Sequence, residues 1–107
     1  MKIITLSIVA ALALGAGAAS AAERLSDAQY VALGRCAGIA EGLNQDAETW
    51  DAVLRDAERG RSTLARSRAS EEHAAARRSA RRADEHSRDR LVDGLTGQCA
   101  AIAPSQS

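Results

Sequence analysis

The two cysteines carry the clearest chemistry in this sequence of 107 residues. Cys36 and Cys99 are its only cysteines, and an even number in an exported chain favours a disulfide, because compartments outside the cytoplasm are oxidising. A bridge within one chain would enclose most of the protein and stabilise it by roughly 4 kcal/mol. A bridge between two chains and a pair of free thiols are the alternatives. The sequence lacks the Cys-x-x-Cys motif that is typical of redox sites.

Basic residues offer a second kind of chemistry, the binding of anions. Residues 55–90 hold 11 arginines and 7 acidic residues, whereas residues 22–54 hold 2 arginines and 6 acidic residues. The densest basic group is formed by Arg77, Arg78, Arg81 and Arg82. Such a group can bind nucleic acid, acidic lipid or an acidic protein. We favour the alternative of a solvated helix face, whose charge is balanced by acidic residues of the same helix or of the first half of the chain.

Two histidines are the remaining candidates for ligand binding. His73 and His86 are 13 residues apart and need not share a helix face, although each could bind a metal ion together with Glu72 or Glu85. The sequence contains no His-Glu-x-x-His motif, no Cys-x-x-Cys-His motif and no methionine-rich stretch. We therefore expect two exposed histidines, no metal ion and no cofactor.

Motifs of known enzymes are absent from the chain. There is no Gly-x-Ser-x-Gly nucleophile elbow and no glycine-rich phosphate loop. Carboxylates are abundant, but no spacing pairs them into an acid–base site. We therefore expect a protein that is not an enzyme.

The first 22 residues have the pattern of a signal for export from the cytoplasm. Met1 and Lys2 are followed by an apolar run over residues 3–14 and by small residues over 15–22. This layout predicts a signal peptide over residues 1–21, cleaved between Ala21 and Ala22. An uncleaved anchor is the alternative, because residues 3–22 are just long enough to span a bilayer. The mature segment, residues 22–107, is then one small domain in the periplasm or outside the cell.

The mature segment has the patterns of helices and turns throughout. A helix is expected over 26–43, because Ser26 and Gln29 have the spacing of a capping box. A second helix is expected over 46–67, with Asp46 as its cap and Leu64 on its apolar face. A third is expected over 70–102. Its first half has no large apolar side chain, but alanine and arginine favour a solvated helix there.

The predicted disulfide restricts how these helices are arranged. In a three-helix bundle, Cys99 would lie roughly 20 Å from Cys36 along the helix axes, whereas a disulfide needs Cα atoms about 4.4–6.8 Å apart. Breaks near Gly60 and near Ala83 would give four helices and bring the cysteines level. Strong tilt or an intermolecular bridge would also resolve the conflict. The sequence thus predicts an all-α fold, a small bundle of three or four helices stapled by one disulfide.

The function expected from these features is non-catalytic. With few large apolar side chains and no reactive motif, the chain is typical of a structural or protein-interaction module that self-associates or binds another envelope protein. The alternative is an anion- or metal-binding protein that uses residues 77–82 and the histidines. A third hypothesis is an envelope redox or stress factor that uses both cysteines. Nucleic acid is disfavoured as a partner, because aromatic side chains for stacking are lacking. Contact with a membrane is expected only through the signal segment before cleavage.

Intact mass spectrometry of the exported protein, with thiol alkylation before and after reduction, tests the predicted processing. We expect a chain that lacks residues 1–21 and whose two thiols react only after reduction, without a covalent dimer. A full-length chain with two free thiols would contradict both the signal peptide and the disulfide.

Overall fold

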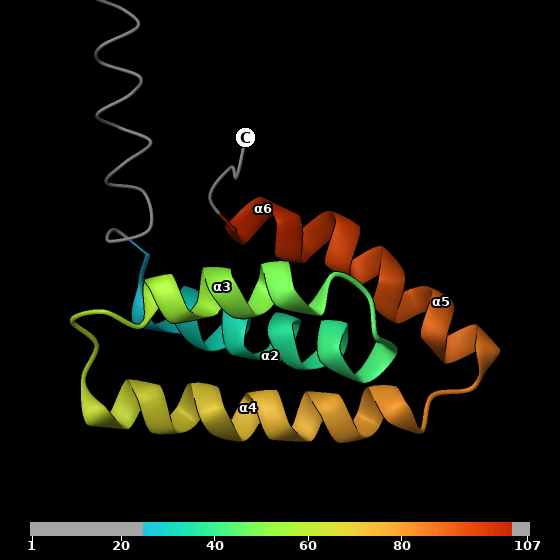
Figure 1. The fold of residues 1–107 in the computed structure, drawn as a ribbon, viewed down its shortest axis with the longest axis horizontal. Coiled ribbons are helices and arrows are strands. Elements are labelled where there is room, and N and C mark those ends of the chain that lie inside the picture. Colours follow the sequence, from blue (N-terminus) through green and yellow to red (C-terminus); the bar gives the residue numbers. More distant parts are fainter. Residues whose placement is uncertain (1–24, 104–107) are drawn as a thin grey trace, which may run out of the picture.

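The part of the chain that the structure describes forms a bundle of four main helices joined by short connections (Figure 1). The computed structural model describes residues 25–103, so the predicted signal peptide at residues 1–21 lies outside the described part. No strand occurs within residues 25–103. The four main helices, which alternate in direction along the bundle, are α2 (Asp27–Leu43), α3 (Ala47–Ala57), α4 (Thr63–Arg81) and α5 (Glu85–Gly94). The all-α fold predicted from the sequence is confirmed.

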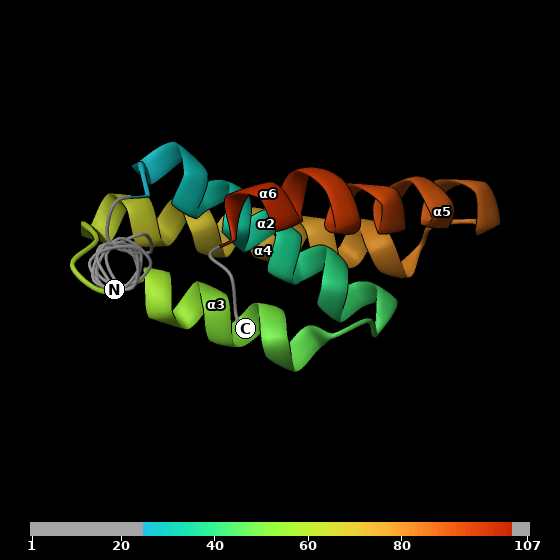
Figure 2. The ribbon, with the colours of Figure 1, turned by 90° about the horizontal axis from the view of Figure 1, so that it is seen from above.

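The end of the chain extends α5 rather than forming a separate helix. A π-helical turn, η2 (Leu95–Cys99), follows α5 directly and leads into the short α6 (Ala100–Ile102). Together these segments run back along α2 (Figures 1 and 2). The guanidinium of Arg88 donates to the carbonyl oxygen of Leu43 at 3.2 Å and so ties α5 to the end of α2.

The first helix begins as its sequence predicts. The backbone N–H of Gln29 donates to the Ser26 hydroxyl at 3.0 Å, and the Gln29 side-chain oxygen accepts from the Ser26 N–H at 3.0 Å. This is the reciprocal capping box. The helix ends at Asn44, which adopts a left-handed conformation with φ of 56°. Asp46 directly precedes α3 as expected, but it has φ of 53° and its side chain makes no capping hydrogen bond.

The segment expected as one helix over 46–67 is not continuous, because it breaks at Gly60, one of the two positions where the sequence allowed a break. Helix α3 ends at Ala57, and Gly60 has φ of 76°, a conformation that glycine adopts without steric cost. The next helix starts after Ser62, whose hydroxyl accepts from the Ala65 N–H at 3.1 Å. Leu64 consequently lies at the start of α4, where it is 65% exposed instead of buried.

The single helix expected over 70–102 is wrong. Helix α4 begins seven residues before Ser70, at Thr63, and it ends at Arg81. A new helix starts after Asp84, whose carboxylate accepts from the Ser87 N–H at 2.8 Å. Ala83 therefore lies in the connection between α4 and α5, at the second of the two breaks that would bring the cysteines level.

These two breaks allow the cysteines to meet. Because α5 and η2 run back along α2, Cys99 lies beside Cys36, with their Cα atoms 5.9 Å apart, and the two form a disulfide. The bridge lies within one chain. Both cysteines are buried in a cluster with Ile39, Leu43 and Leu95.

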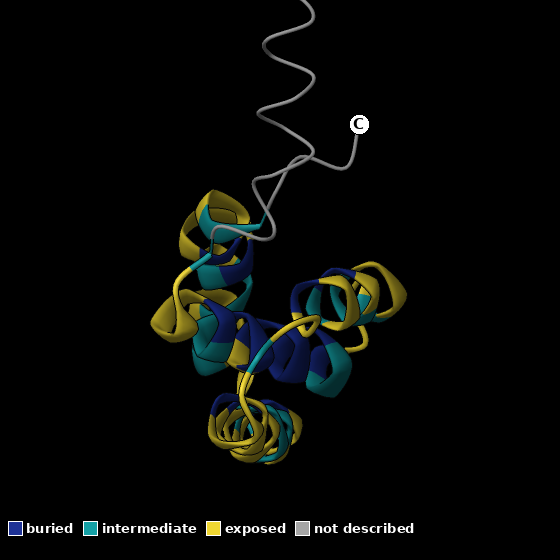
Figure 3. Ribbon diagram, turned by 90° about the vertical axis from the view of Figure 1, so that its left-hand side faces the viewer, coloured by how far each residue is buried: buried dark blue, intermediate teal, exposed yellow. Residues whose placement is uncertain are grey.

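Helix α2 is the centre of the bundle. Viewed end-on, α3, α4 and the α5 segment are arranged around it, and the buried residues gather on and facing α2 (Figure 3). A second cluster of buried residues surrounds Tyr30 and Leu33 and includes Val53 of α3. Trp50 of α3 packs against both clusters, so it connects the two parts of the core.

Helices α2 and α4 approach each other so closely that no side chain fits between their backbones. Gly34, Gly38 and Gly42 form a row on α2 that faces α4. A Cβ atom at Gly34 would lie 2.6 Å from the Ala69 carbonyl oxygen, and one at Gly38 would collide with the His73 carbonyl oxygen. Because the glycines leave this space open, α4 packs on α2 although it contributes alanines rather than large apolar residues.

Substitution of Gly38 tests this contact. We expect Gly38→Ala to lower the free energy of unfolding by roughly 1–3 kcal/mol, because backbone atoms of α4 cannot move aside as a flexible side chain could. Gly94→Ala is the matched control. Gly94 is helical with φ of −62°, and no atom lies within 4 Å of the place that a Cβ atom would take there. Alanine should therefore be neutral or stabilise by up to about 1 kcal/mol.

Urea denaturation of both variants in their disulfide-bonded form measures the difference. Equal stability of the two variants would contradict the close contact.

Candidate functional site

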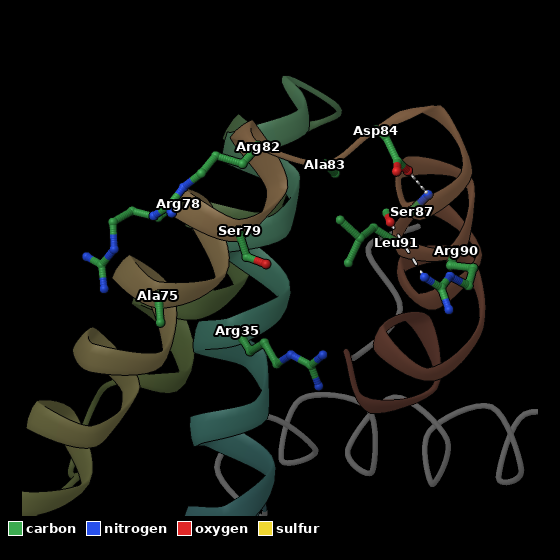
Figure 4. A pocket seen from close by; sticks show the side chains of 10 residues that line it. All are labelled: Arg35, Ala75, Arg78, Ser79, Arg82, Ala83, Asp84, Ser87, Arg90 and Leu91. Carbon is green, nitrogen blue, oxygen red and sulfur yellow. Dashed lines mark hydrogen bonds between the residues drawn. The ribbon is translucent and has the colours of Figure 1, made fainter.

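A cleft of about 830 Å³ lies between the end of α4 and the start of α5. Its wall also includes Arg35 of α2, so three helices contribute to it (Figure 4). The lining is mixed, with apolar groups such as Leu91 next to polar ones. Four arginines are its most prominent members: Arg35, Arg78, Arg82 and Arg90.

The four arginines do not converge on one point. Arg35 extends across the cleft toward α5, and Arg90 bends back toward Ser87 (Figure 4), where its guanidinium lies 3.5 Å from the hydroxyl oxygen. Arg78 and Arg82 extend along the side of α4 that is turned away from α5. All four arginines are exposed. The positive charge is therefore spread over a surface that is longer than one small anion.

Acidic residues do not neutralise this surface. None of the four arginines forms an ion pair with an acidic residue of the described part of the chain. Asp84 is the one carboxylate that lines the cleft, and it already caps α5. The hydrogen bond from the Ser87 N–H lowers the pKa of Asp84, which keeps the cap ionised. The cleft and the adjoining side of α4 thus carry an excess of positive charge.

The four arginines within residues 77–82, which cluster in the sequence, lie in different surroundings in the structure. Arg78 and Arg82 line the cleft, whereas Arg77 pairs with Glu41 of α2 at 2.9 Å and Arg81 is exposed outside the lining. Arg35 lies far away in the sequence, so only the packing of α2 against α4 brings it to the same cleft. Two of the four arginines that cluster in the sequence therefore line the cleft, and the other two do not.

A second polar group lies where α2, α3 and α4 meet. His73 Nε2 lies 3.1 Å from Glu41 Oε2 and 3.9 Å from Asp51 Oδ1. All three side chains are partly buried. The hydrogen bond from Arg77 is the largest cause that lowers the pKa of Glu41, and it outweighs the opposing effect of burial. The group is thus an ordered set of one imidazole and two carboxylates.

The two histidines do not lie together as a pair. His86 is exposed in the first turn of α5, whereas His73 is held between α2 and α3. Sequence reasoning proposed Glu72 or Glu85 as neighbours of the histidines, but the residues that surround His73 are Glu41 and Asp51. No local pattern indicates these partners, because each comes from a different helix.

Comparisons with known proteins add no assignment to these sites. No protein-family model matches the chain, and searches of curated proteins and of solved structures give no significant match. Within residues 25–103, none of the helices combines the length and the apolar character needed to cross a bilayer. The disulfide is compatible with a periplasmic or extracellular location.

Proposed function

We propose that the protein is an exported, non-catalytic binding module that holds an acidic polypeptide segment, which runs through the cleft between α4 and α5 and over the adjoining outer side of α4. The observation that carries this proposal is a group of four exposed arginines at one cleft, none of which forms an ion pair with an acidic residue of the described chain. Arg35 and Arg90 lie in the cleft, and the other two extend along the adjoining outer side of α4 (Figure 4). Arginine is suited to this task, because its planar guanidinium binds a carboxylate through two parallel hydrogen bonds.

An extended acidic segment fits the geometry better than a small anion. The guanidinium groups point in different directions (Figure 4), so a single phosphate or carboxylate would reach only one or two of them. A chain with several carboxylates would reach more. Leu91 and two alanines in the lining offer apolar contacts to the side chains between those carboxylates. Nucleic acid is a poorer ligand, because no aromatic residue lines the cleft for base stacking.

The chemistry of the cleft supports binding rather than catalysis. Ser79 and Ser87 are the hydroxyl groups in the lining, but no histidine lies beside them to act as a base. The one carboxylate, Asp84, is engaged in capping α5. The predicted signal peptide and the disulfide support export, so the partner is expected in the envelope or outside the cell.

The acidic segment can belong to another protein or to a second copy of this chain. Residues 22–54 hold 6 acidic residues and 2 arginines, and Asp46 and Glu48 at the start of α3 are exposed. Light scattering at increasing protein concentration distinguishes the two sources. Salt-sensitive oligomers identify a second copy as the partner, whereas a monomer excludes a second copy.

Fluorescence anisotropy with a labelled oligo-glutamate peptide that contains one leucine tests the proposal. We expect binding that weakens as salt is added. Replacing Arg35, Arg78, Arg82 and Arg90 by glutamine removes four exposed ion pairs of roughly 0.5 kcal/mol each. The total of about 2 kcal/mol corresponds to a roughly 30-fold loss of affinity.

A matched variant separates the cleft from overall charge. Glutamine at Arg55, Arg59, Arg66 and Arg68 changes the net charge equally, at exposed positions outside the cleft. We expect this control to retain most of the affinity. Equal losses in both variants, or no binding by the unmodified protein, would contradict the proposal.

A further inference from the structure

We propose that Glu41, Asp51 and His73 bind one divalent transition-metal ion of the zinc class. The three residues belong to α2, α3 and α4, and they offer one nitrogen and two carboxylate oxygens as ligands. Such a mixed set suits zinc and its neighbours, whereas magnesium and calcium prefer oxygen alone. This site is separate from the arginine cleft and does not depend on the proposed function.

The distances between the ligand atoms are close to those of a metal site. Two ligand atoms bound to one tetrahedral zinc ion at about 2.0–2.2 Å lie about 3.3–3.6 Å apart. His73 Nε2 is 3.1 Å from Glu41 Oε2 and 3.9 Å from Asp51 Oδ1, and all three ligand atoms lie within 4.8 Å of one another. Asp51 is the most exposed of the three, so rotation of its side chain is the movement that would bring its oxygen to this spacing.

The surroundings hold two of the ligands in place before an ion arrives. The His73 backbone lies directly against Gly38, which fixes this turn of α4 over α2. Arg77 donates to Glu41 Oε1 at 2.9 Å and leaves Oε2 facing His73. A hydrogen bond to the second oxygen of a ligating carboxylate is a common feature of metal sites, because it orients the ligand.

Charge and access also favour a cation. Two carboxylates against the single guanidinium of Arg77 leave a net negative charge beside the imidazole. The side chains of His73, Glu41 and Asp51 are 21%, 29% and 37% exposed, so an ion can enter and water can complete its coordination. A bound ion would link α3 to both α2 and α4, as the disulfide links η2 to α2.

Isothermal titration calorimetry of the disulfide-bonded protein with Zn²⁺ tests this site, together with thermal unfolding at increasing Zn²⁺ concentration. We expect one equivalent to bind and the thermal midpoint of unfolding to rise with added Zn²⁺. His73→Gln and Asp51→Asn should each weaken binding by at least about tenfold. Asp51→Asn preserves shape at a partly exposed position, so it informs on the site even if His73→Gln impairs folding.

His86→Gln is the matched control. This histidine is exposed and has Glu85 and Asp89 near it in the sequence, so it would account for adventitious binding at the surface. We expect the affinity of the protein to be unchanged by this substitution. Absence of Zn²⁺ binding, or binding lost in His86→Gln and retained in Asp51→Asn, would overturn the proposal.

Discussion

The contact between the glycines of α2 and the backbone of α4 is the constraint on which the other features of this structure depend. Helix α4 has 19 residues, and its buried residues are alanines. Alanine buries little apolar area, so each contributes little hydrophobic free energy. The close approach of the helices compensates for this small hydrophobic contribution. Dispersion attraction between the two backbones at van der Waals distance adds up over several helical turns. Without the glycines, side chains of α2 would hold α4 away.

The same contact places both candidate sites. With about 100° between successive residues, Arg35 and Glu41 lie roughly 60° to either side of Gly38 around α2. Arg35 therefore faces the gap between α4 and α5, and Glu41 faces the gap between α4 and α3. Cys36 lies on the side of α2 away from the glycines, where it joins η2. One helix thus seats α4, supplies a residue to each site and anchors the disulfide.

Local signals in the sequence predicted local structure well. The Ser26 capping box is a short-range pattern, and it forms as predicted. The requirement that Cys36 and Cys99 meet indicated where breaks were needed, and Gly60 and Ala83 lie at them. Apolar spacing does not locate the start of α4, because Leu64 continues the apolar pattern of α3 although it is exposed. The local signal for this start is Ser62, whose hydroxyl caps the helix.

Local sequence patterns do not predict which residues meet at the two candidate sites. The glycine row, with a glycine at every fourth position of α2, is visible in the sequence, but a helix propensity scale treats each glycine only as a weak point. As a contact surface, the glycine row indicates that another helix packs closely on this face of α2. The row does not identify which turn of α4 lies against it. The grouping of Arg35 with Arg78, or of His73 with Asp51, depends on that register.

Nuclear Overhauser effects across the α2–α4 contact test the central claim most directly. A Cβ atom at Gly38 would lie 3.0 Å from the Ala76 methyl carbon, and one at Gly42 would lie 2.6 Å from that of Ala80. The account predicts strong cross-peaks between the Hα protons of each glycine and the corresponding methyl protons. A well-dispersed spectrum without these cross-peaks, or with other residues of α4 in their place, would contradict it.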